Sequence, residues 1–123
     1  MIRADDMTAC LDLGILVRAS DPRTAVELFG AACDAGLDQA CGRLGLMLIG
    51  GQGVTTDATR GAKLLERACD GGDGSACNNL GRSYHKGIGV AADRDRARAL
   101  WKKACALGDE VGCSNVQAEA RSR

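Results

Sequence analysis

The sequence predicts an all-α fold, an α/α solenoid of antiparallel helix hairpins, and three features of the chain lead to this prediction. A nine-residue segment with a cysteine at each end recurs every 36 residues, as CDAGLDQAC from Cys33, CDGGDGSAC from Cys69 and CALGDEVGC from Cys105. Such a period is typical of repeat proteins built from helix pairs. Helix-forming residues dominate between the glycine clusters, with a single proline. Aromatic residues make up only 2% of the chain, so the core must use aliphatic side chains and cysteine, which favours closely packed helices.

The first helix of each unit, helix A, is predicted from an apolar stripe that a glycine ends. Leu44, Gly45 and Leu48 share one helix face, and the next unit repeats this spacing at positions 80, 81 and 84. A Gly-x-Gly-Val turn follows at 51–54 and again at 87–90. Because glycine tolerates the left-handed conformation that closes a helix, we expect helix A to end there.

The second helix, helix B, is predicted to begin after an aspartate and to end at glycine 36, 72 or 108. Asp21, Asp57 and Asp93 are good N-caps, and Pro22 suits a first helical position. Arg98 and Lys102 lie opposite the apolar face, so we expect replacement of either to cost under about 0.5 kcal/mol. The expected buried face occupies four equivalent positions in each unit: Ala25, Leu28, Phe29 and Ala32; Gly61, Leu64, Leu65 and Ala68; Ala97, Leu100, Trp101 and Ala104.

The two ends of the array depart from the pattern. The first unit is short, because 23 positions separate Cys10 from Cys33 where 28 separate Cys41 from Cys69. A last helix A is expected after Asp109, and its polar end, QAEARSR, suits the solvent-facing cap of a solenoid. We therefore expect one domain, residues 1–123, with units at about 5–36, 37–72 and 73–108 and a closing helix at 109–121, seven helices in all.

The repeat resembles the Sel1-like repeat family, which is TPR-like, over roughly residues 5–118. The segment ACNNLGRSYHKGIGV, which starts at Ala76, follows the family pattern A-x-x-x-L-G-x-x-Y-x-x-G-x-G-V most closely. Gly61 replaces the usual alanine and Leu48 the usual tyrosine. The added cysteine pairs are similar to those of the cysteine-rich Sel1-like proteins, which include the Helicobacter cysteine-rich proteins.

The constant spacing of the cysteines favours a disulfide within each C-x7-C segment. The predicted pairs are Cys33–Cys41, Cys69–Cys77 and Cys105–Cys113. Helix packing would also allow a bond from Cys41 to Cys69. The number of residues between the equivalent cysteines differs between units, however, whereas a covalent bond should keep the spacing of its two cysteines constant. Unbonded thiols packed between helices are a third interpretation. We expect no metal and no cofactor, because the pairs are spread along a rod and do not converge. Cys10 lacks a local partner.

Charge and hydropathy restrict the partners. Lys plus Arg and Asp plus Glu each number 16, so no net field draws the chain toward nucleic acid. No apolar run approaches 18 residues, so we expect no membrane insertion. Disulfides would favour a periplasmic, secreted or other oxidising compartment, although the N-terminal MIRADDMTAC is acidic where a signal peptide is basic. We expect a monomer that binds a protein or peptide.

The candidate site consists of the helix A residues that lie outside the apolar core stripe. In stacked hairpins of this kind the A helices line the concave face. Apolar side chains there offer anchors, and amides can hydrogen-bond the backbone of an extended peptide. A competing interpretation is that the apolar residues cover a further repeat or pack on their own. The candidate groove residues are Asp12, Ile15 and Leu16; Arg43, Leu46 and Met47; and Asn78, Asn79, Arg82 and Ser83.

No catalytic residue is expected. Ser83 and Lys86 match S-x-x-K, and the resemblance to cysteine-rich relatives implies a penicillin-binding or β-lactamase-like activity as an alternative. The companion motifs S-D-N and K-T-G are missing, and His85 is the only histidine. The sequence therefore favours a non-catalytic protein-interaction module or scaffold, with an assembly chaperone of an oxidising compartment as a further alternative.

Overall fold

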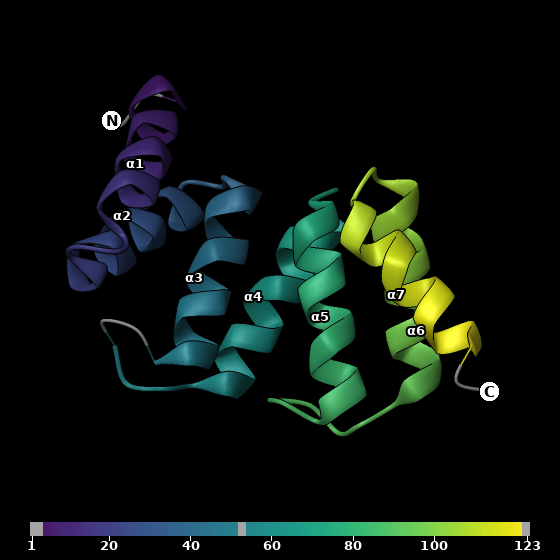
Figure 1. Ribbon diagram of the computed structural model, residues 1–123. Coiled ribbons are helices and arrows are strands. Elements are labelled where there is room, and N and C mark those ends of the chain that lie inside the picture. Colours follow the sequence, from purple (N-terminus) through teal and green to yellow (C-terminus); the bar gives the residue numbers. More distant parts are fainter. Residues whose placement is uncertain (1–3, 52–53, 122–123) are drawn as a thin grey trace.

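The computed structural model describes residues 4–51 and 54–121, and within these ranges the chain forms seven α-helices stacked as antiparallel hairpins (Figure 1). The odd-numbered helices are the predicted A helices and the even-numbered ones the B helices, which confirms the predicted fold class. The elements in order are α1 (Ala4–Val17), α2 (Pro22–Asp34), α3 (Asp38–Gly50), α4 (Ala58–Asp70), α5 (Gly74–Lys86), α6 (Arg94–Ala106) and α7 (Glu110–Arg121).

Aspartate side chains cap the B helices. Asp21 accepts the backbone N–H of Thr24 at 3.2 Å, and Asp57 and Asp93 each accept the N–H three residues on at 3.1 Å. The Thr24 hydroxyl also donates to Asp21 at 2.6 Å. This side-chain hydrogen bond, aided by the backbone one, lowers the pKa of the Asp21 carboxyl, because both favour its charged form. Each B helix therefore begins where the sequence predicted.

Glycines with positive φ end the helices. Gly51 (φ 69°) and Gly87 (φ 73°) are the left-handed caps of α3 and α5. Part of the predicted turn at 51–54, residues 52–53, lies outside the described residues. Gly36, Gly72 and Gly108 also have positive φ beyond the ends of the B helices. The expected helix ends are thus confirmed at these five glycines.

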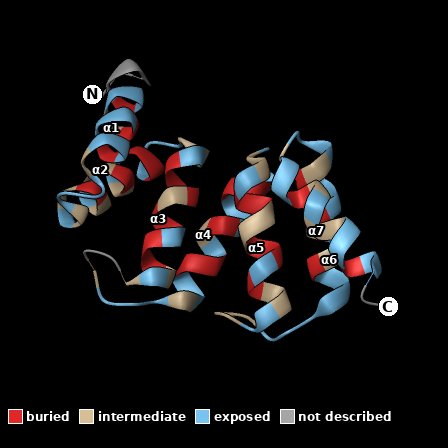
Figure 2. Cartoon of the chain, viewed as in Figure 1, coloured by how far each residue is buried: buried red, intermediate tan, exposed pale blue. Residues whose placement is uncertain are grey.

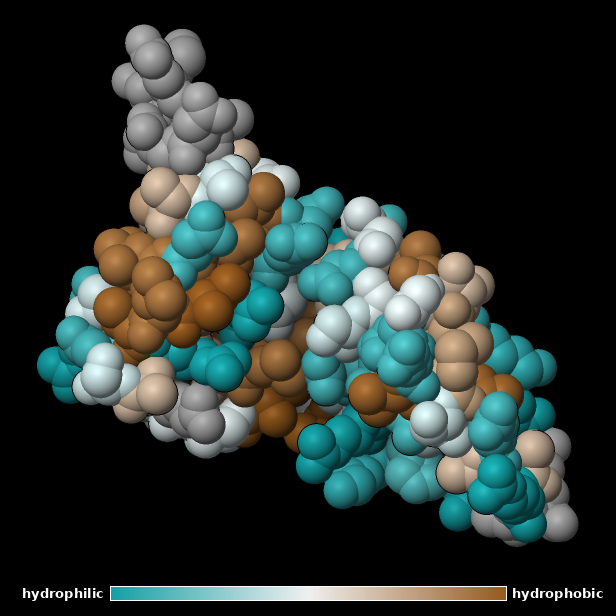
Figure 3. Space-filling model, turned by 45° about the horizontal axis from the view of Figure 1, so that its top comes forward, coloured by the Kyte–Doolittle hydropathy of each residue, from teal (hydrophilic) through white to brown (hydrophobic). Residues whose placement is uncertain are grey.

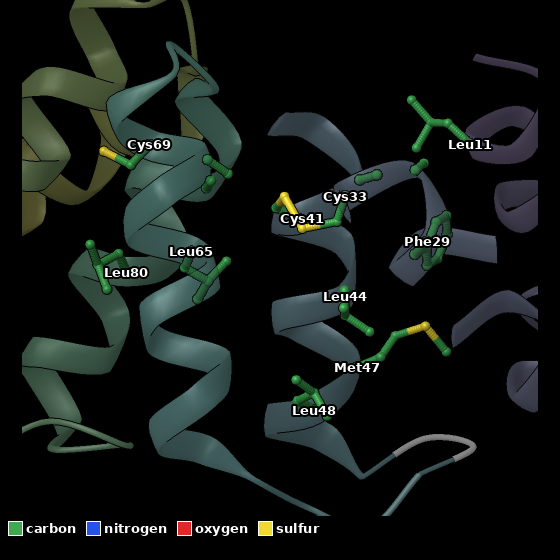
Figure 4. Close-up of a cluster of buried hydrophobic side chains, with 14 of the residues drawn as sticks. Leu11, Phe29, Cys33, Cys41, Leu44, Met47, Leu48, Leu65, Cys69 and Leu80 are labelled. Carbon is green, nitrogen blue, oxygen red and sulfur yellow. A yellow bond between two sulfur atoms is a disulfide. The ribbon is translucent and has the colours of Figure 1, made fainter. Parts of the chain in front are cut away.

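The core is a layer of small and aliphatic side chains between the A and B helices, seen as the red residues of Figure 2. Phe29, Leu48 and Leu65 are its largest fully buried side chains. In Figure 4, Met47 of α3 points toward the α1–α2 hairpin, while Leu80 of α5 lies beside Leu65 of α4. Successive hairpins therefore share one continuous core.

The tight packing of α3 on α4 explains why Gly61 departs from the family pattern. A Cβ added at Gly61 would lie 2.7 Å from the Gly45 carbonyl oxygen and 2.7 Å from Cγ1 of Ile49. A Cβ added at Gly45 would in turn lie 2.7 Å from the Gly61 carbonyl oxygen. Neither position has room for alanine without a shift of backbone, so the two glycines set the closeness of this crossing.

A disulfide joins each B helix to the following A helix. Cys33–Cys41, Cys69–Cys77 and Cys105–Cys113 are bonded, and each pair has a Cα–Cα separation of 4.6 Å. This separation lies in the ordinary range for disulfides. The bonds tie α2 to α3, α4 to α5 and α6 to α7, so the three hairpins and the closing helix are covalently linked through their junctions. Cys10 is a free, half-buried cysteine.

Arg98 of α6 does not have the fully exposed setting that the sequence predicted. Its side chain is 24% exposed, with Nη2 lying 3.5 Å from Asp95 and 3.7 Å from Glu119 of α7. Glu119 itself is only 8% exposed. The expected solvent-facing setting is wrong because the polar closing helix packs across this side of α6, whereas the effect of replacing Arg98 on stability stays a prediction. Lys102, by contrast, is exposed as expected.

Candidate functional site

The A helices form the inner side of the solenoid. The helix α3 contacts α5, and α5 contacts α7, whereas the described residues of α2, α4 and α6 make no comparable contacts with one another. Figure 1 shows α3, α5 and α7 following one another along the same side of the molecule. An array whose A helices converge more closely than its B helices curves toward the A side, which is therefore the concave one.

Hollows follow one another along this concave side. One of about 580 Å³ lies between the α1–α2 hairpin and α3, two of about 150 and 260 Å³ lie between α3 and α5, and one of about 460 Å³ lies between α5, α6 and α7. Neighbouring hollows share residues: Arg43 and Leu46 belong to the first two, and Asn79 and Arg82 to the last two. We call this continuous depression the inner groove.

Five of the predicted residues, namely Arg43, Leu46, Asn78, Asn79 and Arg82, line the inner groove with exposed or half-buried side chains. The structure thus brings together the candidates from α3 and α5. The candidates from α1 are separate: Asp12, Ile15 and Leu16 are exposed but line none of these four hollows.

Met47 and Ser83 were predicted as accessible groove residues, and the structure corrects this. They are 2% and 3% exposed and form part of the groove floor. In the repeat they are equivalent to Leu16, which is 79% exposed. The difference arises because a preceding hairpin stands beside α3 and α5, and none stands beside α1 among the described residues. Burial at this position therefore depends on the neighbouring unit as well as on the helix itself.

Hydrogen bonds fix the floor of the last hollow, between α5 and α7. Asn115 donates through Nδ2 to Oδ1 of Asn78 at 2.7 Å, which links the two helices. Nε1 of Trp101 donates to the Asn78 carbonyl at 3.2 Å, and the ring of His85 packs 5.5 Å from the Trp101 ring. Nδ2 of Asn79 donates to a carbonyl of its own helix at 2.9 Å, and the Asn79 amide oxygen makes no hydrogen bond with a described residue.

Sequence reasoning missed the contribution of α6 and α7 to this hollow. Trp101 of α6 and Val111 and Asn115 of α7 line it, together with Lys86 of α5. The repeat contains a signal for Asn115, because this residue follows Asn79 by 36 positions as Asn79 follows Arg43. The prediction treated the closing helix as a cap alone and so did not extend the groove onto it.

The inner groove has excess positive charge. Arg43, Arg82 and Lys86 make no ion pair with any described residue. Its acidic residues are engaged elsewhere, since Asp73 caps α5 by accepting two backbone N–H groups at 3.1 and 3.4 Å and Glu119 pairs with Arg98. An anionic group of a ligand would therefore meet cations that have no internal counter-charge.

The geometry offers little for catalysis at Ser83. Its side chain is almost fully buried and lines the hollow between α3 and α5, whereas Lys86 lines the one between α5 and α7. Nδ1 of His85 is buried without a hydrogen-bond partner among the described residues, so no acid orients this imidazole. Within the same residues no three potential metal ligands cluster, and no helix is long and apolar enough to cross a membrane.

Apolar and polar surface separate along the molecule. In Figure 3 the largest brown area lies over the N-terminal half, and teal and white atoms prevail over the C-terminal half. The exposed large apolar residues of the first half are Leu13, Ile15 and Leu16 of α1 and Leu46 of α3. The polar residues of the groove are concentrated on α5 and α7. Of the four exposed apolar residues, Leu46 lines the inner groove, whereas those of α1 lie outside its hollows.

Comparisons with known proteins agree on the fold. The model of a family described as Sel1 repeat matches residues 9–37, 38–73 and 74–109. A Sel1 repeat protein from Oxalobacter formigenes is 35% identical with a TM-score of 0.80, and the match covers 94% of this chain and 92% of that one. No curated protein sequence matches the chain.

Two further solved structures are similar. A protective antigen of uropathogenic Escherichia coli with an SLR fold is 29% identical with a TM-score of 0.84, and the match covers 91% of this chain and 25% of the antigen, so the chain spans about a quarter of that protein. Helicobacter pylori cysteine-rich protein B is 22% identical with a TM-score of 0.73, at 92% and 96% coverage. The last likeness bears on the fold alone.

Proposed function

The chain belongs to the Sel1 repeat family, and on that premise we propose that it is a non-catalytic interaction module that binds a segment of a partner protein in the inner groove. Proteins of this family generally mediate protein–protein interactions. The observation that carries the proposal is the continuity of the groove: each of its four hollows shares at least two lining residues with the next one along the array, drawn from Arg43, Leu46, Asn79 and Arg82. An extended segment fits such a trough better than a compact ligand does.

Two of the groove residues, Asn79 and Arg82, are not needed for the core packing of α5. Arg82 is exposed and unpaired among the described residues, and the Asn79 amide keeps its oxygen as an acceptor. Packing of α5 is already accounted for by Leu80, Gly81 and Ala76, which are buried. Exposed guanidinium and amide groups that the core does not need are well suited to hydrogen-bond a partner backbone or carboxylate.

A paired substitution tests the groove. A partner is first isolated by unbiased capture from the source organism with the intact protein, and its affinity is then measured by calorimetry. Replacing Asn79 and Arg82 together by Ala should weaken binding at least tenfold, about 1.4 kcal/mol, with the melting temperature nearly unchanged.

The matched control is Lys102→Ala, an exposed change on α6 outside the groove. It should leave the affinity for the same partner unaltered. Binding that survives the double substitution but is lost in the control would place the interaction on the outer face and refute the groove.

A further inference from the structure

The hollow between α5 and α7 is a three-helix site at the polar end of the inner groove. Its volume is about 460 Å³, within the range of ligand pockets. The floor is fixed by the Asn115–Asn78 side-chain hydrogen bond at 2.7 Å and by Trp101, whose Nε1 donates to the Asn78 carbonyl. Because these contacts join α5, α6 and α7, the site is largely formed before any ligand arrives.

The free charge of this hollow is positive. Arg82 and Lys86 project from successive turns of α5 and make no ion pair with a described residue. The carboxylate among the lining residues, Glu119, is nearly buried and faces Arg98 at 3.7 Å. The macrodipole of α5 favours a cation in its last turn, which accounts for Lys86 but not for Arg82, one turn earlier. The hollow therefore complements an anion.

The side-chain amides of Asn78 and Asn115 add hydrogen-bonding groups to the positive charge of the hollow. Oδ1 of Asn78 and one N–H of Asn115 are used in their mutual bond. The Nδ2 group of Asn78 remains a donor and Oδ1 of Asn115 an acceptor, and neither is hydrogen-bonded to a described residue. A donor and an acceptor side by side match the C=O and N–H of an extended peptide.

We propose that this hollow binds an extended peptide that carries a carboxylate. The peptide backbone lies against Asn78 and Asn115, and the carboxylate is held by Arg82 and Lys86. Eight residues of helix separate Asn78 from Lys86, about 12 Å, which corresponds to about four residues of extended peptide. The proposal rests on the proposed function and specifies its partner class. The carboxylate belongs either to the peptide's C-terminus or to an Asp or Glu side chain.

The test uses two pools of randomised hexapeptides, one with free C-terminal acids and one with C-terminal amides, presented to the immobilised full chain and quantified by mass spectrometry. We expect bound peptides to be enriched at least tenfold in carboxylates. Enrichment of the free-acid pool over the amide pool identifies the C-terminal carboxylate. Equal recovery of both pools, with Asp or Glu enriched at one position, identifies a side chain.

Charge-removing variants locate the site. Arg82→Gln with Lys86→Gln should abolish the enrichment and leave the melting temperature unchanged. The control Lys63→Gln with Lys102→Gln removes the same amount of positive charge from exposed positions of α4 and α6. This control variant should still enrich carboxylate-bearing peptides. No carboxylate enrichment, or enrichment that survives the first pair of substitutions, would overturn the proposal. A third outcome is peptide binding that shows no preference for carboxylates and is lost in Asn79→Ala with Arg82→Ala. That result would overturn the carboxylate proposal while the proposed function of the groove stands.

Discussion

Among single residues, Arg98 shows how contact with a neighbouring helix changes the burial and the ion pairing of a side chain. Sequence placed it on the solvent side of α6, beside Lys102, yet it lies between Asp95 and the nearly buried Glu119. Taking away one member of a desolvated ion pair leaves the other charge poorly compensated. The pair is long at 3.7 Å and Arg98 retains some exposure, so the effect falls below that of a fully buried pair.

We predict that Arg98→Ala lowers the free energy of unfolding by about 1–2 kcal/mol, because Glu119 loses a partner in a site with little water. Lys102→Ala, one turn away and exposed, should change it by less than about 0.5 kcal/mol. Urea unfolding of both variants measures the difference. Equal effects at the two positions would show that the ion pair between Arg98 and Glu119 contributes nothing to stability.

For the helices, the distance between neighbouring axes is set by glycine. The α3–α4 crossing brings the Gly45 and Gly61 backbones together, and no Cβ fits at either place without displacement. Gly30 in α2 differs, since a Cβ there would meet no atom within 4 Å. The sequence placed Gly45 and Gly61 on the buried faces of their helices and Gly30 outside them, and the two kinds of glycine should respond to alanine with opposite changes in stability.

Gly45→Ala should destabilise the protein by about 1–3 kcal/mol, because the added methyl would have to push the Gly61 carbonyl and α4 away. Gly30→Ala should stabilise it by about 0.5–1 kcal/mol, because alanine loses less backbone entropy in a helix interior. Thermal unfolding of the two variants beside the parent chain shows whether each substitution raises or lowers the stability. A stabilised Gly45→Ala would mean that the helices are not held as closely as the structure indicates.

The elements that sequence predicted well are those fixed within one repeat. The aspartate caps, the glycine ends and the alternation of A and B helices depend on residues close in the chain, and they are where the 36-residue period placed them. The groove was predicted only in part, because burial at Met47 and Ser83 depends on the preceding hairpin. The role of Arg98 depends on how α7 docks, which no local pattern specifies, whereas the 36-residue period does place Asn115 after Asn79.

The whole molecule is a linear array in which each hairpin packs mainly on its neighbours. Helices that are adjacent in the chain are in contact, and contacts beyond them are few. Among the described residues no hairpin packs outside α1, and Leu13 is exposed there, whereas its equivalents Leu44 and Leu80 are buried. In such an array stability is roughly a sum over units and interfaces, so a local change should loosen the units beside it and leave distant ones intact.

The three disulfides allow this view to be tested, because they are identical in loop length but differ in position. Each closes a loop of nine residues, worth about 2.5 kcal/mol in the chain-entropy model. Replacing Cys105 and Cys113 by Ala should speed amide hydrogen exchange mainly in α7, the last helix. Replacing Cys69 and Cys77 by Ala should speed it in helices on both sides, since the α4–α5 junction couples the two halves. Hydrogen exchange followed by mass spectrometry resolves the individual helices. Alkylation of the unreduced parent chain should modify Cys10 alone, which verifies that all three disulfides are present. A uniform rise in exchange across every helix in both variants would mean that the chain unfolds as one cooperative unit, and the unit-by-unit description of its stability would then be wrong.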